Sequence, residues 1–190
     1  MRLIIAAVLA GLAMFAWSAV SHMALGLVDS SMKQVPNEAA VMSAMKTNIA
    51  EPGFYLLPNM DMTHKGTEAE QAAWAAKYKE GPTAIIIYNP TGDDPISPRQ
   101  LGVELVSNIA AALVVGMILM LASVSFSRGV TIATLVGLAG WLSINVSYWT
   151  WYHFPTNFVT AELIDQIVGW LLAGFVLGFI LQRRPYGAHR

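Results

Sequence analysis

Six polar side chains lie within or beside long apolar runs of this chain. Their types could bind a ligand or transfer a proton. An imidazole next to one or two carboxylates suits a divalent metal ion, and ionisable groups inside apolar helices commonly mark ion, proton or headgroup sites. We therefore predict a candidate polar binding site for a metal, a proton or a polar headgroup. Its residues are His22, Asn108, Asn145, His153, Glu162 and Asp165.

The same residues also have a plainer interpretation, in which they hydrogen-bond one another and a neighbouring polar segment. His22 alone suits a hydrogen bond between helices better than a metal ligand. The sequence contains no HExxH motif, nucleophile elbow, phosphate loop or Rossmann glycine pattern, and it has no cysteine. We therefore favour the structural interpretation, predict no catalytic residue, metal centre or cofactor, and keep the binding site as the alternative.

The spacing of these residues predicts that they form one layer. Asp165, Gly169 and Ala173 are four residues apart and share one helical stripe, which Glu162 joins three residues before Asp165. At about 1.5 Å per residue, Asp165 lies roughly 7–10 Å inside its apolar run. Polar residues of the other three runs lie at similar depths: His22, Asn108 and Asn145.

The composition predicts the elements that must hold this layer. Apolar residues make up 55% of the 190 residues and charged residues only 12%, with a mean hydropathy of +0.52. A soluble domain of this length would be far more polar, so we expect a membrane protein. No basic block suited to nucleic acid is present, so nucleic acid is not expected as a partner.

Four apolar runs are each long enough to cross about 30 Å of hydrocarbon. The first could instead be a signal peptide, but its apolar run is long for one, so we expect an uncleaved anchor. We predict a bundle of four transmembrane helices with a small α/β extracytoplasmic cap between helices 1 and 2. The segments are 1–28 (helix 1), 29–99 (periplasmic cap), 100–127 (helix 2), 130–151 (helix 3), 158–182 (helix 4) and 183–190 (cytoplasmic tail).

Local signals place the elements of the cap. Pro36 opens a helix that ends near Glu51, and the short apolar runs 53–58 and 82–90, bounded by Gly and Pro, read as strands. Between them, Thr67 and Glu70 form a capping-box pattern at the start of a helix that Gly81 ends. A cap of about 70 residues is too small to bury much core alone.

The charges orient the predicted spans. Asp29 to Glu104 carries ten acids and six bases, whereas the other ends of the spans carry only arginine: Arg2, Arg128, Arg183, Arg184 and Arg190. By the positive-inside rule, both termini are cytoplasmic and residues 29–99 are extracytoplasmic. The aromatic residues 148–154 would then lie at the outer interface.

Small residues indicate how the spans pack. Gly174 and Gly178 form a GxxxG pair on the last run, and Gly137 and Gly140 are similar positions on the third. We expect ordinary packing within the chain from these positions, and a dimerisation face is the alternative.

At Phe15-Ala16-Trp17-Ser18, at 53–58 and at Trp151-Tyr152-His153-Phe154-Pro155, the chain resembles small uncharacterised bacterial inner-membrane proteins. These proteins have one span, an outer domain and three further spans. The resemblance implies this layout and no activity, so it carries no functional residue over.

The expected function is a non-catalytic integral membrane protein, an accessory or scaffold subunit of a larger inner-membrane complex. Its expected partners are the lipid bilayer and other membrane subunits, bound through helix faces or the cap. The alternative is a membrane enzyme or carrier that uses the polar layer for a lipid-linked, ionic or metal ligand.

Overall fold

The structure of the chain is a computed structural model that describes residues 1–60, 63, 64 and 66–182. The tail predicted at 183–190, with Arg183, Arg184 and Arg190, lies outside the described residues. The chain divides into two compact units, which are described separately below. One comprises residues 1–33 with 96–190 (the helical unit), and the other comprises residues 34–95 (the inserted unit).

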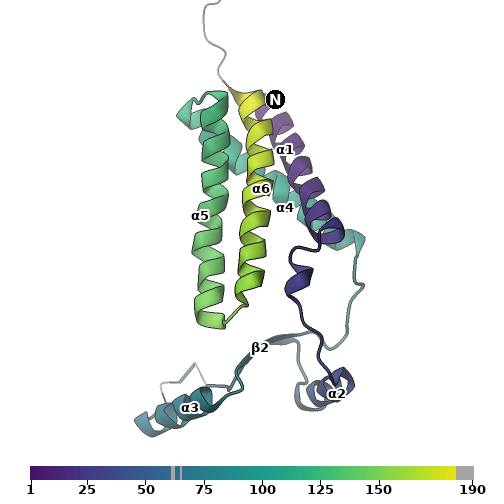
Figure 1. Cartoon of the computed structure of the whole chain (residues 1–190), viewed down its shortest axis with the longest axis vertical. Coiled ribbons are helices and arrows are strands. Elements are labelled where there is room, and N and C mark those ends of the chain that lie inside the picture. Colours follow the sequence, from purple (N-terminus) through teal and green to yellow (C-terminus); the bar gives the residue numbers. More distant parts are fainter. Residues whose placement is uncertain (61–62, 65, 183–190) are drawn as a thin grey trace, which may run out of the picture. The chain divides into compact units, whose positions relative to one another are not determined.

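The helical unit contains four helices that are long and apolar enough to cross a membrane, as the composition predicts. The first is the segment Arg2–Ser31, which begins with α1 (Arg2–Ala19), and the others are α4 (Pro98–Ala122), α5 (Phe126–Tyr152) and α6 (Thr156–Leu181). Figure 1 shows α5 and α6 side by side, with α1 next to α6. Helix α1 packs on α4 and α6, while α4 and α5 touch only slightly. The contact between α1 and α6 therefore connects the α1–α4 pair to the α5–α6 pair.

The first predicted span is not one regular helix. After α1, the π-helical turn η1 (Val20–Ala24) follows, in which the Leu25 N–H donates to the Val20 carbonyl at 2.9 Å. Gly26 then takes a positive φ of 56°, and the 3-10 turn η2 (Asp29–Ser31) ends the segment. The wider π turn lies at His22, one of the predicted site residues, and such turns are frequent at functional sites.

Helix α4 ends earlier than the sequence predicts. Its C-cap residue Ser123 adopts the left-handed conformation with φ 50°, and α5 begins at Phe126. Arg128 and Gly129, which separate the predicted spans 100–127 and 130–151, therefore lie within the first turn of α5. Gly129 is needed there for packing, because a Cβ at this position would lie 3.1 Å from the Gly178 Cα.

The core of the helical unit is built mostly from alanine, glycine and a few branched residues, as membrane helix packing requires. The buried apolar residues of the central cluster are Ala6, Ala7, Ala10, Ala112, Val115, Leu119, Val124, Ala133, Trp170, Ala173 and Leu177. The GxxxG pair packs on α5, since a Cβ at Gly174 would lie 3.0 Å from that of Ala133. The packing within the chain that the sequence predicts for this pair is confirmed.

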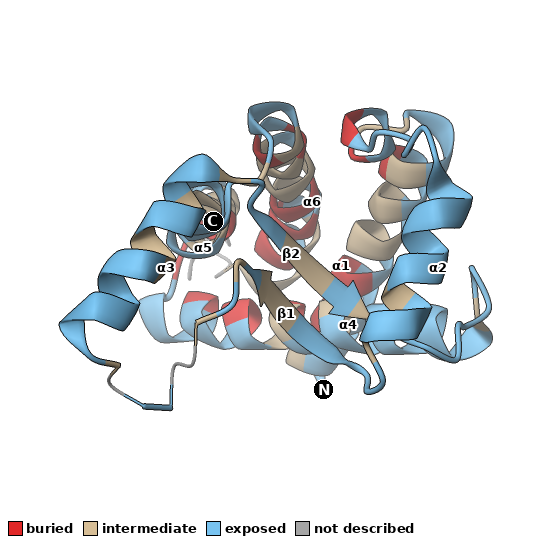
Figure 2. Cartoon of the chain, turned by 90° about the horizontal axis from the view of Figure 1, so that it is seen from below, coloured by how far each residue is buried: buried red, intermediate tan, exposed pale blue. Residues whose placement is uncertain are grey.

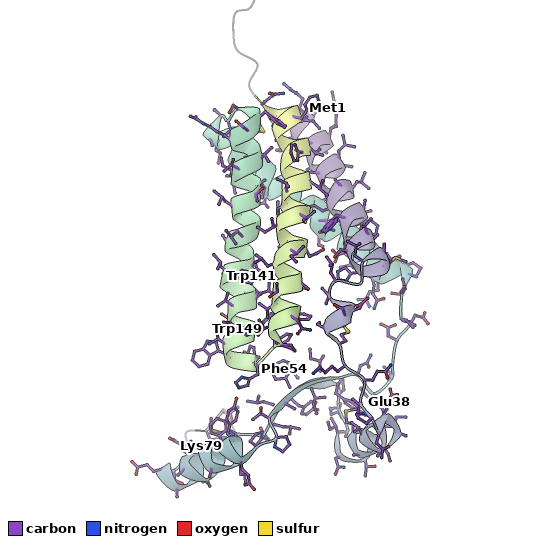
Figure 3. All side chains as sticks on the ribbon, viewed as in Figure 1. Met1, Glu38, Phe54, Lys79, Trp141 and Trp149 are labelled. Carbon is purple, nitrogen blue, oxygen red and sulfur yellow. The ribbon has the colours of Figure 1, made fainter. Side chains whose placement is uncertain are left out.

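The connection between α5 and α6 is a short turn lined with aromatic rings. His153 ends α5 with a left-handed φ of 57°, and the ring of Phe154 stacks on that of Tyr148 with centroids 5.4 Å apart. Trp141 and Trp149, both labelled on α5 in Figure 3, donate their indole N–H groups across the turn region, to the Val159 carbonyl and the Thr156 hydroxyl. These contacts hold the two helices in register at this end.

At the opposite end of the bundle, the chain begins where α6 finishes (Figure 1). The Arg2 guanidinium donates to the Ile180 carbonyl at 2.6 Å, which satisfies a backbone group at the C-terminus of α6. A cation at this position also interacts favourably with the helix dipole.

The inserted unit contains the four elements that its sequence predicts. They are α2 (Glu38–Asn48), β1 (Gly53–Leu57), α3 (Glu68–Glu80) and β2 (Ala84–Tyr88). The two strands pair antiparallel, with Gly53 opposite Tyr88 and Leu57 opposite Ala84. A two-stranded sheet is marginal without further packing.

Burial in this unit is low. None of its described residues is buried, and Figure 2 shows α2, α3, β1 and β2 in exposed and intermediate colours only. Phe54 and Ile87 face each other across the sheet and are 62% and 81% exposed. The inserted unit therefore leaves much of its apolar surface exposed to solvent, as expected for a segment too short to bury a large core.

Helix α3 begins with the predicted capping box. The Thr67 N–H and hydroxyl donate to Glu70 Oε2 at 2.7 and 2.9 Å, and the Glu70 N–H donates back to the Thr67 hydroxyl at 3.3 Å. The hydrogen bond from the Thr67 backbone, and then the one from its side chain, hold the pKa of the Glu70 carboxyl below its usual value of 4.5.

This contact predicts a pH dependence for the start of α3. Because the folded-state pKa is lowered, its stabilisation is present above about pH 4.5 and is lost as the pH falls through the lowered folded value. In the full chain, the carboxyl carbon shift of Glu70 should titrate below that of a free glutamate, and the helical shifts of Ala69 and Gln71 should decline in the same range. In Glu70→Gln, which keeps an acceptor oxygen but does not titrate, the helical shifts should stay constant over that range. A decline of equal size in the variant would contradict the assignment.

Candidate functional site

A small polar cavity lies between α1, α4 and α6, and all its walls belong to the helical unit. Its volume is about 70 Å³. Its polar walls are Ser18 from α1, Glu104 and Asn108 from α4, and Asp165 and Gln166 from α6. The remaining walls are Met14, Trp17, Gly169 and Trp170. Two predicted site residues, Asn108 and Asp165, therefore meet at one place.

Asp165 is held in this cavity through its backbone, while part of its carboxylate has no partner. The Trp17 indole N–H donates to the Asp165 carbonyl at 3.2 Å, so α1 and α6 are joined at this level. Asp165 Oδ1 is buried and has no hydrogen-bond partner among the described residues. A buried carboxylate oxygen without a donor is costly, so this oxygen is the group of the cavity that a ligand would stabilise most.

Glu104 also belongs to the site, although its position in the sequence marks only the end of a polar stretch. The Asn108 amide donates to Glu104 Oε1 at 3.1 Å, one helical turn away on α4. The i, i+4 spacing of a carboxylate and an amide was the signal in the sequence, because such side chains are neighbours on a helix.

His22 and Glu162 form a second group beside the cavity. Glu162 is half-buried and lies within electrostatic range of both Asp165 and His22. Neither His22 nor Glu162 lines the cavity itself. The neighbouring Ser21 is fully buried, and its hydroxyl has no hydrogen-bond partner among the described residues.

The structure does not bring the other two predicted residues to this cavity. Asn145 is partly buried on α5, which contributes no residue to the cavity wall. His153 is exposed and ends α5 in the turn before α6. The predicted layer thus contains three helices at the cavity, and α5 supplies packing instead.

Metal binding by histidine and carboxylates has little geometric support. Within residues 1–60, 63, 64 and 66–182, no three His, Asp or Glu side chains are grouped so that they could hold a metal ion. The cavity offers two carboxylates together with neutral hydroxyl and amide groups.

A larger hollow of about 1010 Å³ lies in the inserted unit, along α3 and the segment before it. Its walls include Asn59, His64, Glu70 and Trp74. Positions 61, 62 and 65 of the adjoining segment lie outside the described residues, so no site is assigned to this hollow.

Comparisons of the chain with protein-family models, with curated proteins and with solved structures find no match. Functional inference therefore depends on the geometry of the chain itself. That geometry offers an oxygen-rich cavity between three apolar helices and an inserted unit with uncovered apolar strands.

Proposed function

We propose that this protein is a non-catalytic integral membrane protein that serves as an accessory or scaffold subunit of a larger complex in a bacterial inner membrane. The observation that carries the proposal is the state of the inserted unit, where no described residue is buried and Phe54 and Ile87 are exposed side by side. Uncovered apolar surface that is framed by polar residues is typical of interaction sites.

The charge of the inserted unit supports a protein partner. Residues 34–95 carry eight acids and four bases, so the unit is negatively charged. Anionic lipid would repel it, whereas a protein surface with apolar residues bordered by lysine or arginine would be complementary.

We further propose that both termini are cytoplasmic and that the inserted unit is extracytoplasmic. Arg2 contacts the end of α6, and Gly129, which follows Arg128, packs on Gly178 near that same end. Two arginines therefore lie at one end of the bundle, which supports a cytoplasmic location for this end.

Site-specific photo-crosslinking tests the partner proposal. A photoreactive residue at Ile87 is expected to give one discrete crosslinked product in cells, because this side chain would lie in the interface. The same residue at Lys79, on α3, is the control and should give little product. Gentle detergent extraction followed by native mass measurement should then show the chain in a larger assembly. A monodisperse monomer without a crosslink at Ile87 would refute the proposal.

A second candidate function is a carrier or enzyme that binds a polar or ionic ligand within the bundle. The specific observation in its favour is the cavity at Asp165, with its buried carboxylate oxygen that lacks a donor. Ionisable residues inside membrane helices are commonly part of substrate or ion pathways. In cells, Asp165→Asn should then alter the phenotype that depends on this protein.

A further inference from the structure

We propose that the cavity between α1, α4 and α6 binds a single sodium ion. This inference rests on the second candidate function and names the ligand that it would bind. It does not depend on the partner proposal, which concerns the inserted unit.

The size of the cavity sets the size of its ligand. Its volume of about 70 Å³ is several times the roughly 10–15 Å³ that one water requires. It is also far below the roughly 300 Å³ at which pockets for organic ligands begin. The space therefore suits one small ion with a water molecule, and excludes a lipid headgroup or an organic substrate.

The chemistry of the walls favours a cation. The cavity presents the Asp165 and Glu104 carboxylates, the Ser18 hydroxyl and the amide oxygens of Asn108 and Gln166. These are hard oxygen ligands, which alkali and alkaline-earth cations prefer. No lysine, arginine or histidine is among the described residues that line the cavity, so no cation of the protein competes for the site.

The hydrogen bonds among the described residues leave one oxygen of the cavity wall without a donor. Asn108 gives an amide hydrogen to Glu104, and the indole of Trp17 donates to the Asp165 backbone carbonyl, so neither contact reaches the Asp165 carboxylate. Asp165 Oδ1 is buried without a donor from any described residue. A bound cation would compensate this oxygen directly.

The charge balance favours a monovalent ion. Glu104 is exposed and its Oε1 accepts a hydrogen bond from Asn108, so the wall charge with a buried oxygen that lacks a donor among the described residues is that of the partly buried Asp165 carboxylate. A single positive charge neutralises it, whereas a divalent ion would bring a second charge into a medium of low dielectric constant. The neutral oxygens of Ser18, Asn108 and Gln166 complete the shell.

Equilibrium binding of radioactive ²²Na⁺ to the purified full-length chain in detergent tests this proposal. In a choline chloride buffer, the wild-type chain should bind ²²Na⁺ saturably, at one ion per chain. Asp165→Asn should weaken the affinity at least about tenfold, because it removes the charge that faces the ion. Ser18→Ala and Asn108→Ala should each weaken it less, and they test the site even if Asp165→Asn does not fold.

Ser143→Ala is the matched control for Ser18→Ala. It also removes a serine hydroxyl from a long apolar helix, but Ser143 is on α5, which contributes no residue to the cavity wall, and its hydroxyl donates to the Gly140 carbonyl. Its ²²Na⁺ affinity should stay within about threefold of wild type, since the substitution lies outside the site.

Three results would overturn the sodium assignment: no saturable ²²Na⁺ binding by wild type, an unchanged affinity in Asp165→Asn, or displacement of ²²Na⁺ by Ca²⁺ at much lower concentration. If ²²Na⁺ does not bind and Asp165→Asn still alters the cellular phenotype, the sodium assignment fails while the polar site keeps its role. If ²²Na⁺ binds as expected and the phenotype is unaffected, the assignment stands and the second candidate function fails.

Discussion

Replacing Gly11 with alanine is expected to push α1 away from α4 and to lower the free energy of unfolding by about 3 kcal/mol. A Cβ at Gly11 would lie 2.7 Å from both the Cα and the N of Ile109, and 2.6 Å from its Cγ1. Two of these atoms are backbone and cannot rotate away. The only relief is a shift of one helix, which would also disturb the contacts of Ala7 and Ala10 in the core.

Unfolding of the full-length chain in mixed micelles, followed by circular dichroism as the denaturing detergent fraction rises, measures this effect. Gly102→Ala, on α4, is the matched control, because a Cβ at Gly102 would have no described atom within 4 Å. It should unfold at or slightly above the wild-type midpoint, since alanine favours helix over glycine. Equal midpoints for the two variants would show that α1 and α4 are not packed as described.

Replacing Gly137 with alanine is expected to cost about 2 kcal/mol by separating α5 from α6. The indole of Trp170 covers Gly137 so closely that a Cβ would lie 2.6 Å from the ring atom Cγ and closer still to Cδ1. Trp170 is only 8% exposed and has little room to turn. The cost should be smaller than at Gly11, because a side chain can adjust further than a backbone.

Gly140→Ala is the control for this prediction, because it lies three residues further along α5 and its Cβ would meet no described atom within 4 Å. A double-mutant cycle with Trp170→Ala isolates the contact. In that background the ring is absent, so Gly137→Ala should cost about 1 kcal/mol less than in wild type. A cost that is the same in both backgrounds would exclude the Trp170 ring as its cause.

Signals that are local in the sequence predicted much of this fold. The four apolar runs gave the four candidate spans, and the Thr67–Glu70 pair gave the start of α3. The short apolar runs bounded by Gly and Pro predicted β1 and β2. Each of these features depends on residues within a few positions of one another.

Features that depend on packing between distant helices were not predicted. Depth along a helix follows from counting residues, so the level of Asn145 could be inferred, but the direction in which α5 faces is set by its contact with α6. Asn145 accordingly does not line the cavity. The π turn at Val20–Ala24 and the left-handed Ser123 likewise have no pattern in the sequence that marks them.

The candidate site was predicted in part for the same reason. Asp165 and Asn108 do line a common cavity, while His22 and Glu162 lie beside it and His153 does not join it. Glu104 was overlooked because a charged residue near the end of an apolar run usually faces water. Its hydrogen bond to Asn108 depends on the helical turn between them.

The way α1 packs has a consequence for how the chain is made. Helices α5 and α6 are joined by a short turn and can pair as soon as both are synthesised, whereas the partners of α1 begin only at Pro98. At a translation rate of about 5–20 residues per second, α1 waits roughly 5–15 s for α4. During that interval Gly11, which lies against Ile109 of α4 in the finished bundle, has no partner on that helix. Biogenesis therefore has to keep the first helix from other partners until α4 has been synthesised.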